Sequence, residues 1–353
     1  MLVMQSGPRS FFQIFQRPSV PDPTPAPAAG ASEEWLHAFI QVFGAGPSPH
    51  QAAHLEFIAA SSGEVTPRQR YRRIISGFDH QDLRTAFNVR WAAEDVRLHE
   101  VEGFSMYLDE ADISVAQVIA SGHYEPHLIA FFNAMLQPGM HVVDAGANIG
   151  FYSLLSARRV GPQGKVWSFE PNSENARLVL ASAAHNAFSN IELHPVALGN
   201  VRGHVQFTSA IGSNGVFVDD EHRNLLDASC RIVPLARLDD FGIDRVDLFK
   251  MDVEGAEGLL LEGALGTIEQ CRPLVVSEFS CEMLQRISGW EGARFIQAIA
   301  DRGYAPFMCD KETHALVAVD DAVAFAQGFG RTGRIEDLVF CPRERLDTLP
   351  LAR

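Results

Sequence analysis

The stretch His141–Leu155, HVVDAGANIGFYSLL, decides the fold of this chain because it joins a strand pattern to a helix pattern. Its first residues are apolar, and a short turn containing glycine follows them. Beyond the turn, Ile149, Tyr152 and Leu155 recur at the spacing of a helix that packs on a sheet. A strand that leads through such a turn into a helix brings backbone N–H groups close to a ligand. We therefore predict a nucleotide-type binding site at this turn.

Strand patterns and helix patterns alternate after this stretch, which is typical of a parallel sheet with helices on both faces. Residues 205–210 and a Gly/Asn-rich loop at 212–215 interrupt the alternation. Two late apolar stretches, 316–319 and 337–340, predict edge strands. The alternating strand patterns cover residues 142–146, 165–170, 191–198, 246–255 and 273–279.

We predict three regions along the chain. Residues 1–31 include a Pro/Ala-rich stretch that cannot pack a core, so they are predicted to form a disordered tail. Residues 32–89 carry apolar side chains at helical spacing and are predicted to form a small all-helical accessory domain of three helices. This domain either docks a protein partner or presents a substrate, or it only shields one side of the main domain. Residues 90–353 are predicted to form the main α/β domain, which opens with a hairpin over residues 96–108.

The composition excludes several classes of protein. The formal net charge of -15 argues against a broad face that grips nucleic acid or an anionic membrane. The apolar residues near the N-terminus form a run too short to span a bilayer and lack the profile of a signal peptide. The five cysteines are scattered without CxxC spacing, which favours free thiols in a reducing compartment. We therefore expect a cytoplasmic protein without a membrane span and without a nucleic-acid partner.

Acidic residues close four of the predicted strands: Asp144, Glu170, Asp252 and Glu278. The carboxyl ends of parallel strands meet at one edge of a sheet, where ligands bind. One acid at such a position is often only a helix N-cap. Several together cost free energy unless a cation or hydrogen-bond donors compensate. The ligand is therefore expected to be partly cationic and rich in hydroxyls.

The turn after the first strand differs from that of dinucleotide-binding proteins. Their G-x-G-x-x-G pattern lets the backbone approach a pyrophosphate. Here Asp144 ends the strand, and Asn148 stands where a second glycine would permit that contact. Glu170, at the end of the next strand, can still take both ribose hydroxyls. This combination favours a nucleoside without phosphates and with a charged tail, and S-adenosylmethionine, with its amino and sulfonium cations, fits it.

Four runs in order along the chain give a resemblance to a known family: DAGANIGFYS (144–153), FEPNSEN (169–175), HPVALGN (194–200) and FKMDVEGAE (249–257). Between about residues 96 and 340 the chain resembles the FkbM family of S-adenosylmethionine-dependent methyltransferases. The resemblance implies the class I methyltransferase fold, a Rossmann-like α/β fold with a seven-stranded, mostly parallel sheet and an antiparallel last strand. It also implies O-methylation of a sugar or polyketide hydroxyl.

The resemblance also implies the residues that hold the cofactor. Glu170 would bind the ribose hydroxyls. Glu125, in the Tyr124–Pro126 segment that matches the family, either approaches the cofactor or only starts the following helix. The methionine end of the cofactor would be lined by Asp144, Gly146, Ala147 and Asn148, with Gly150 also at the cofactor. Beside Glu170 the chain would turn at Pro171 and Asn172, and the adenine would be bordered by Ala197 and Leu198.

Asp252 and Glu254 are the candidate catalytic residues. Alternate residues of an extended strand face the same way, so both could point into the rim of the sheet. Methyl transfer requires alignment of the acceptor oxygen and a base for its proton. Asp252 is the first candidate for these tasks and Glu254 the second, while Lys250 could tune or neutralise them. A divalent ion between these acids and Glu278 is conceivable, but the spacing does not require one, and we predict no metal.

Residues 209–231 are predicted to be a loop that covers the substrate, in which Phe217 could stack on the acceptor, or an ordinary surface loop. The main functional prediction is an O-methyltransferase that acts on a small-molecule or glycan hydroxyl, such as a secondary metabolite. A protein partner could bind through residues 32–89. Two alternatives remain: a non-catalytic S-adenosylmethionine-binding scaffold protein, and, third, an NAD-dependent oxidoreductase.

Overall fold

The computed structural model describes residues 34–36, 38–39, 52, 55–56, 58–60, 96–211, 214–217, 230–329 and 334–350. The chain divides into two units, Met1–Ile74 and Ile75–Arg353. The described residues of the first unit are helical and include the buried side chains of Trp35, Phe39 and Leu55. The predicted tail, much of the predicted helical domain and the domain limit at residue 89 lie outside the described residues. The predicted domain limits therefore stay predictions.

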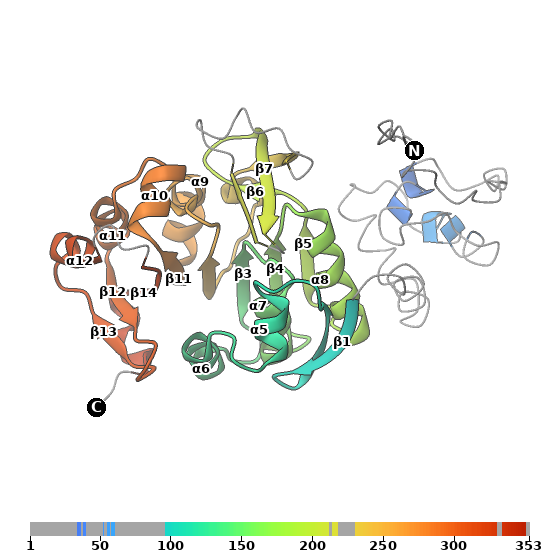
Figure 1. Ribbon diagram of the computed structural model, residues 1–353, viewed down its shortest axis with the longest axis horizontal. Helices are drawn as coiled ribbons and strands as arrows, with labels where there is room; N and C mark the ends of the chain where they lie inside the picture. Colours follow the sequence, from blue (N-terminus) through green and yellow to red (C-terminus); the bar gives the residue numbers. More distant parts are fainter. Residues whose placement is uncertain are drawn as a thin grey trace, which may run out of the picture. The chain divides into compact units, whose positions relative to one another are not determined.

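An eight-stranded sheet forms the centre of the second unit (Figure 1). The strands β3, β4, β5, β10 and β11 run parallel to one another, and β14 runs antiparallel to both β11 and β12. This arrangement confirms the predicted Rossmann-like α/β fold with an antiparallel last strand, and the short β13 adds one strand to the predicted seven. In spatial order the strands are β13 (Leu316–Ala318), β12 (Tyr304–Cys309), β14 (Glu336–Pro342), β11 (Leu274–Phe279), β10 (Leu248–Met251), β3 (His141–Ala145), β4 (Lys165–Phe169) and β5 (Ile191–His194).

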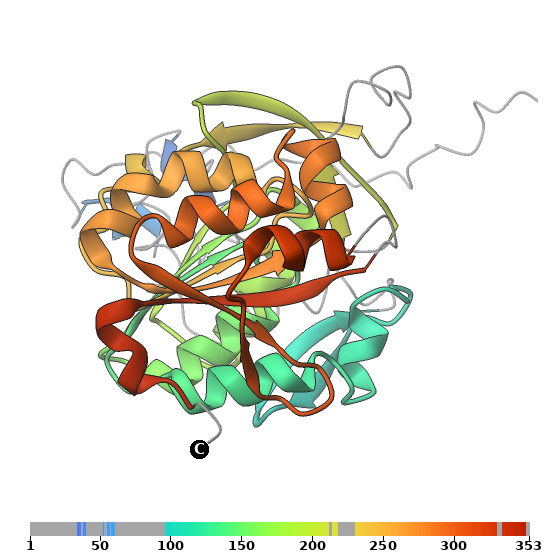
Figure 2. The same cartoon turned by 90° about the vertical axis from the view of Figure 1, so that its left-hand side faces the viewer.

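Helices cover both faces of this sheet (Figure 2). On one face α9 and α11 pack on it through Leu260, Leu261 and Ile296, which are fully buried. On the other face α7 contacts β3 and β4, and α8 contacts β5. The helices are α5 (Ala116–Ala120), α6 (Pro126–Met135), α7 (Phe151–Val160), α8 (Ser173–His185), α9 (Glu257–Cys271), α10 (Cys281–Ile287), α11 (Gly292–Ala300) and α12 (Ala322–Phe329), with 3-10 turns η2 (Leu238–Phe241) and η3 (Arg343–Thr348).

The predicted hairpin is present as β1 (Val96–Val101) and β2 (Phe104–Asp109). Its two turn residues, Glu102 and Gly103, both have positive φ, as a two-residue hairpin turn requires. The backbone N–H of Tyr107 donates to Ser182 Oγ at 2.9 Å, which fastens β2 to α8. The hairpin therefore packs beside the sheet and does not extend it.

Three strand predictions were wrong. β14 is not an edge strand, because it lies between β11 and β12 and all its residues are buried. The strand predicted over residues 191–198 breaks after His194, and Ala197–Leu198 (β6) enters a second sheet. β12 was not predicted at all. Apolar runs report burial, but they do not say which neighbour a strand will pair with.

The second sheet has four strands in the order β6, β9 (Cys230–Ala236), β7 (Gly203–Ile211) and β8 (Asn214–Phe217). Part of the predicted Gly/Asn-rich loop is thus a strand, because β8 gains an antiparallel partner in β7. Residues 218–229 of the predicted covering loop lie outside the described residues. In Figure 1 the arrowheads of β3 and β4 point toward β6 and β7, so this sheet stands beyond the carboxyl ends of those strands.

Candidate functional site

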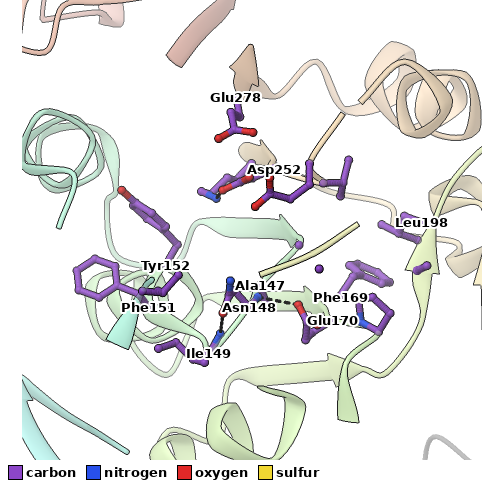
Figure 3. A pocket seen from close by; sticks show the side chains of 18 of the residues that line it. Ala147, Asn148, Ile149, Phe151, Tyr152, Phe169, Glu170, Leu198, Asp252 and Glu278 are labelled. Carbon is purple, nitrogen blue, oxygen red and sulfur yellow. Dashed lines mark hydrogen bonds and ion pairs between the residues drawn. The ribbon is translucent and has the colours of Figure 1, made fainter. Parts of the chain in front are cut away.

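A pocket lies at the carboxyl ends of β3, β4, β10 and β11, at the edge where the sequence places its acidic residues (Figure 3). Figure 3 shows Glu278 and Asp252 on one side of the pocket and Asn148, Glu170 and Leu198 on the other. Most of the predicted site residues come together here. They are Glu125, Gly146, Ala147, Asn148, Glu170, Pro171, Ala197, Leu198, Asp252 and Glu254.

Three predicted site residues do not line the pocket. Asp144 is only 1% exposed, and its Oδ2 accepts a hydrogen bond of 2.6 Å from the hydroxyl of Ser153, behind the turn. Asn172 caps α8 by accepting from the backbone N–H of Glu174 at 3.0 Å. Gly150 has a φ of 95° and starts α7. These residues shape the site, and direct contact of Asp144 with the methionine end is not supported.

The turn after β3 is fixed by its own hydrogen bonds. The backbone N–H groups of Gly146 and Ala147 both donate to the carbonyl of Phe169 at 3.0 Å. The N–H of Asn148 donates to Glu170 Oε2 at 2.8 Å. The end of the neighbouring strand β4 therefore uses these three N–H groups, and a contact of a ligand with backbone N–H groups stays a prediction for the start of α7. A turn without free N–H groups is a poor cradle for a pyrophosphate.

Gly146 is required by the contact between two loops. It has a φ of 80°, and a Cβ built there would lie 1.7 Å from the backbone oxygen of Asp252. The N–H of Asp252 in turn donates to the carbonyl of Ala145 at 3.0 Å. The turn after β3 and the loop after β10 thus touch through their backbones, and only glycine leaves room for this contact.

Glu170 is positioned by two backbone donors. Its Oε1 accepts from Asn172 N at 2.7 Å and its Oε2 from Asn148 N at 2.8 Å. The residue is 4% exposed, and burial raises the pKa of its carboxyl to about 7 although these N–H groups act in the opposite direction. The Asn175 side chain also hydrogen-bonds to this carboxyl, so three of its four acceptor positions are used within the protein. Glu170 therefore presents a rigidly held acceptor to the pocket.

On the opposite side of the pocket, Lys250 contacts both Asp252 and Tyr152. Its ammonium lies 2.5 Å from Asp252 Oδ2 and 4.7 Å from the centre of the Tyr152 ring. The Tyr152 hydroxyl donates to Glu125 Oε2 at 2.6 Å. Burial alone would lower the pKa of Lys250, but the charges of Asp252, Asp144 and Glu125 raise it above its usual value. Lys250 is therefore a permanent cation among carboxylates.

Asp252 and Glu254 reach the pocket in another way than predicted. β10 ends at Met251, and Glu254 lies in the loop that follows, with a φ of 55°. The buried carboxylate of Glu257, at the start of α9, accepts from Val253 N at 2.9 Å and from Gly255 N at 3.2 Å. A turn held by Glu257, and not an extended strand, presents the two acids.

Burial and mutual repulsion raise the pKa of most carboxyls on this side. The pKa of Glu125 and that of Glu254 rise to about 7, and the pKa of Glu278 rises well above its usual value. Burial is the main cause in each case, and the charge of Asp252 adds to it. Within the described part of the chain, the carboxyls of Glu254 and Glu278 have no hydrogen-bond partner. This side of the pocket favours a ligand that brings positive charge or hydrogen-bond donors.

Several pocket residues were not predicted. Tyr152, in the first turn of α7, joins Glu125 to Lys250, and Tyr124 also lines the pocket. The helical spacing of Tyr152 indicated only that it packs on the sheet. Phe207 and Phe217 line the pocket from β7 and β8 and pack with Ala197, near the predicted adenine position, and the stacking of Phe217 on an acceptor stays a prediction. No sequence motif marks that hairpin.

The described residues contain no cluster of three or more His, Cys, Asp or Glu that could hold a metal ion. No helix within the described ranges is long and apolar enough to cross a bilayer. The four cysteines whose side chains are described, Cys271, Cys281, Cys309 and Cys341, carry free thiols, as predicted for them.

Comparisons with known proteins match this chain to methyltransferases. A family model described as methyltransferase FkbM domain matches residues 144–306, which contain the β3 turn and the loop after β10. Methyltransferase sdnD of Sordaria araneosa is 29% identical, over 42% of this chain and 68% of that protein. Methyltransferase 1 of Beauveria bassiana is 28% identical, over 35% of this chain and 57% of that protein. A solved methyltransferase FkbM from Methylobacillus flagellatus KT covers 65% of this chain and 56% of its own, with 16% identity and a TM-score of 0.37.

Proposed function

Residues 144–306 form a domain of the FkbM methyltransferase family, and from that premise we propose that this protein is an S-adenosylmethionine-dependent O-methyltransferase. The proposed acceptor is a hydroxyl of a sugar, a polyketide or another secondary metabolite or glycan. The fungal relatives are named only as methyltransferases. The O-methyl acceptor therefore belongs to the proposal, as do a cytoplasmic location and a protein partner for residues 32–89.

One observation carries the cofactor assignment: the two sides of the pocket differ in chemistry in the way S-adenosylmethionine requires. Glu170 offers a carboxylate fixed by two backbone donors on one side. On the other side, Glu125, Asp252, Glu254 and Glu278 surround Lys250, the only basic residue among the described ones that line the pocket. A ligand with a diol at one end and positive charge at the other matches both sides.

The residues present fit this cofactor. Glu170 would hold the ribose hydroxyls, and Ala197, Leu198 and Phe169 would border the adenine. The carboxylates near Lys250 would face the cationic end. When bound, S-adenosylmethionine supplies a methyl group already activated by the positive charge on its sulfur. The protein therefore needs to hold and align the acceptor and to accept one proton.

The loop after β10 suits both tasks. Asp252 pairs with the ammonium of Lys250 and is fixed by its backbone to β3, so it can orient a hydroxyl through a hydrogen bond. Glu254 lines the same pocket and has no partner for its carboxyl among the described residues. These positions lie on the acidic side of the pocket, which would face the cationic end of the cofactor.

The function is tested by transfer of a labelled methyl group. The purified protein is incubated with S-adenosylmethionine carrying a labelled methyl and with fractions of a cell extract. We expect label in an extract component, and identification of that component as a methyl ether gives the acceptor. Asp252→Ala should lose at least about tenfold in turnover while it still binds the cofactor.

The alternatives give different results. A scaffold protein would bind S-adenosylmethionine and label nothing in any fraction. An oxidoreductase would bind NAD in competition with S-adenosylhomocysteine. The occupied N–H groups of Gly146, Ala147 and Asn148 disfavour that second possibility, because they leave no cradle for a pyrophosphate.

A further inference from the structure

The carboxylates around Lys250 are not equivalent as proton acceptors. Asp252 Oδ2 lies 2.5 Å from the ammonium of Lys250, which is only 4% exposed. Protonation of Asp252 would leave this buried ammonium without its nearest partner. Asp252 is therefore better suited to orient an acceptor than to take its proton.

Glu254 is held in place and is free to react. Its neighbours Val253 and Gly255 are fixed on both sides by the carboxylate of Glu257, which is 1% exposed. Glu254 itself adopts a left-handed backbone conformation that a non-glycine residue rarely keeps without support. Its carboxyl lines the pocket and accepts no hydrogen bond from the described residues. Glu257 thus acts as a positioning residue for Glu254.

We propose that Glu254 takes the proton of the acceptor hydroxyl and holds it until the products leave. Glu254 is then ionised while the cofactor sulfur is positively charged, and neutral once the sulfur has become a neutral thioether. This inference rests on the proposed function. In the step, an oxygen–carbon bond forms, the sulfur–carbon bond breaks, and the hydroxyl proton passes to a Glu254 oxygen. The positive sulfonium and the negative carboxylate disappear together, so the net charge of the buried pocket is unchanged.

The surroundings of Glu254 support this coupling. Burial first, and then the charge of Asp252, raise the pKa of Glu254 to about 7, while Lys250 acts in the opposite direction. A nearby cation favours the ionised carboxylate, and a neutral thioether does not. The other titratable groups on the elements around it are Tyr124 and Glu125 before α6, Asp144 at the end of β3, Tyr152 on α7, Glu257 on α9, Glu278 on β11 and Asp337 on β14.

Calorimetric titration in two buffers of different ionisation enthalpy tests the proposal without an acceptor. The number of protons released is measured when wild-type protein binds S-adenosylmethionine and when it binds S-adenosylhomocysteine. We expect S-adenosylmethionine to release about half a proton more at pH 7, since a carboxyl with a pKa near 7 is about half protonated there. Glu254→Gln, which keeps the side-chain volume, should abolish the difference between the two ligands.

Glu278→Gln is the matched variant, because it removes the other carboxyl without a partner in the same pocket. We expect it to keep the difference in proton release. Equal proton release for both ligands in the wild type, or loss of the difference in Glu278→Gln but not in Glu254→Gln, would overturn the role of Glu254. Failure of the wild type to bind either ligand would instead overturn the proposed function.

Discussion

The buried ammonium of Lys250 pairs with the half-buried carboxylate of Asp252, with Nζ 2.5 Å from Oδ2. The ring of Tyr152 covers the same nitrogen at 4.7 Å. Within the pair, Lys250 supplies the one positive charge among the described residues that line the pocket, whose other charged side chains are carboxylates. It therefore stabilises the site and also fixes Asp252 beside the position proposed for the transferred methyl.

Removal of this ammonium should strongly destabilise the protein. In Lys250→Met the charges of Asp252, Asp144 and Glu125 lose their nearest cation, and we expect a loss of about 3–5 kcal/mol in the free energy of unfolding at pH 7.5. The loss should be smaller at pH 5.5, because protonation then neutralises carboxyls that lack a cation. Urea unfolding at both pH values measures it. An equal loss at both would contradict the electrostatic explanation.

Lys165→Met is the control for the Lys250 variant. Lys165 also pairs with a buried glutamate, Glu192 at 3.0 Å, and covers the Trp167 ring at 4.3 Å, but it does not line the pocket. Its replacement should reduce stability without changing the Kd for S-adenosylmethionine.

Gly146 should tolerate no side chain. In Gly146→Ala the new Cβ would overlap the backbone oxygen of Asp252, and alanine would also have to adopt a φ of 80°. We expect a loss of about 3–5 kcal/mol from overlap and strain together. Gly139→Ala is the matched control, since Gly139 has a φ of 82° with no atom within 4 Å of the new Cβ. It should lose only about 1–2 kcal/mol in the same thermal or urea unfolding experiment.

Glu170 should determine the affinity for the nucleoside. Glu170→Ala removes the acceptor of two backbone N–H groups and, in the proposed complex, of the ribose hydroxyls. Charge-assisted hydrogen bonds contribute about 1.5–3 kcal/mol, so we expect the Kd for S-adenosylmethionine to rise by about 10- to 100-fold in calorimetry. Glu174→Ala, at the start of α8 beside the site, should leave the Kd unchanged because its side chain is 52% exposed and pairs with Arg177. Undiminished binding by Glu170→Ala would exclude the cofactor assignment.

Glu257 should make the protein less stable as the pH rises. Burial raises the pKa of its carboxyl from 4.5 to about 7, so between these values the folded state binds more protons than the unfolded state. Stability therefore falls between about pH 4.5 and pH 7 and then levels off. Glu257→Gln keeps an oxygen that can accept from Val253 and Gly255.

The unfolding free energy of Glu257→Gln, relative to wild type, should increase by up to about 3 kcal/mol between pH 5 and pH 8. Urea titrations at intervals of one pH unit measure this difference. Glu269→Gln, on the same helix with a side chain 62% exposed, should show no such change. A constant difference across the range for Glu257→Gln would show that its charge is not buried in the folded state.

The regular part of the fold was predictable from local patterns. The strand–turn–helix pattern of residues 141–155 gave β3 and α7, and the alternation after it gave the parallel inner strands. Strands β8, β9 and β12 were missed, and β14 was placed at an edge. β12 and β14 depend on partners distant in sequence, whereas β8 pairs with the preceding strand β7. The pattern of apolar and polar side chains along a segment indicates how far the segment is buried, but it does not indicate which strand the segment pairs with.

The sequence by itself determined that acidic residues gather at the carboxyl ends of parallel strands, because each strand direction follows from the alternation with helices. Only the tertiary structure decided what each acid does. Asp144 is buried behind the turn with Ser153, Glu170 is fixed by two N–H groups, and Asp252 is paired with Lys250. Glu254 owes its position to Glu257 and a left-handed backbone. These differences come from distances of a few ångströms between residues far apart in sequence, and on that scale burial and neighbouring charge set the protonation of a carboxyl.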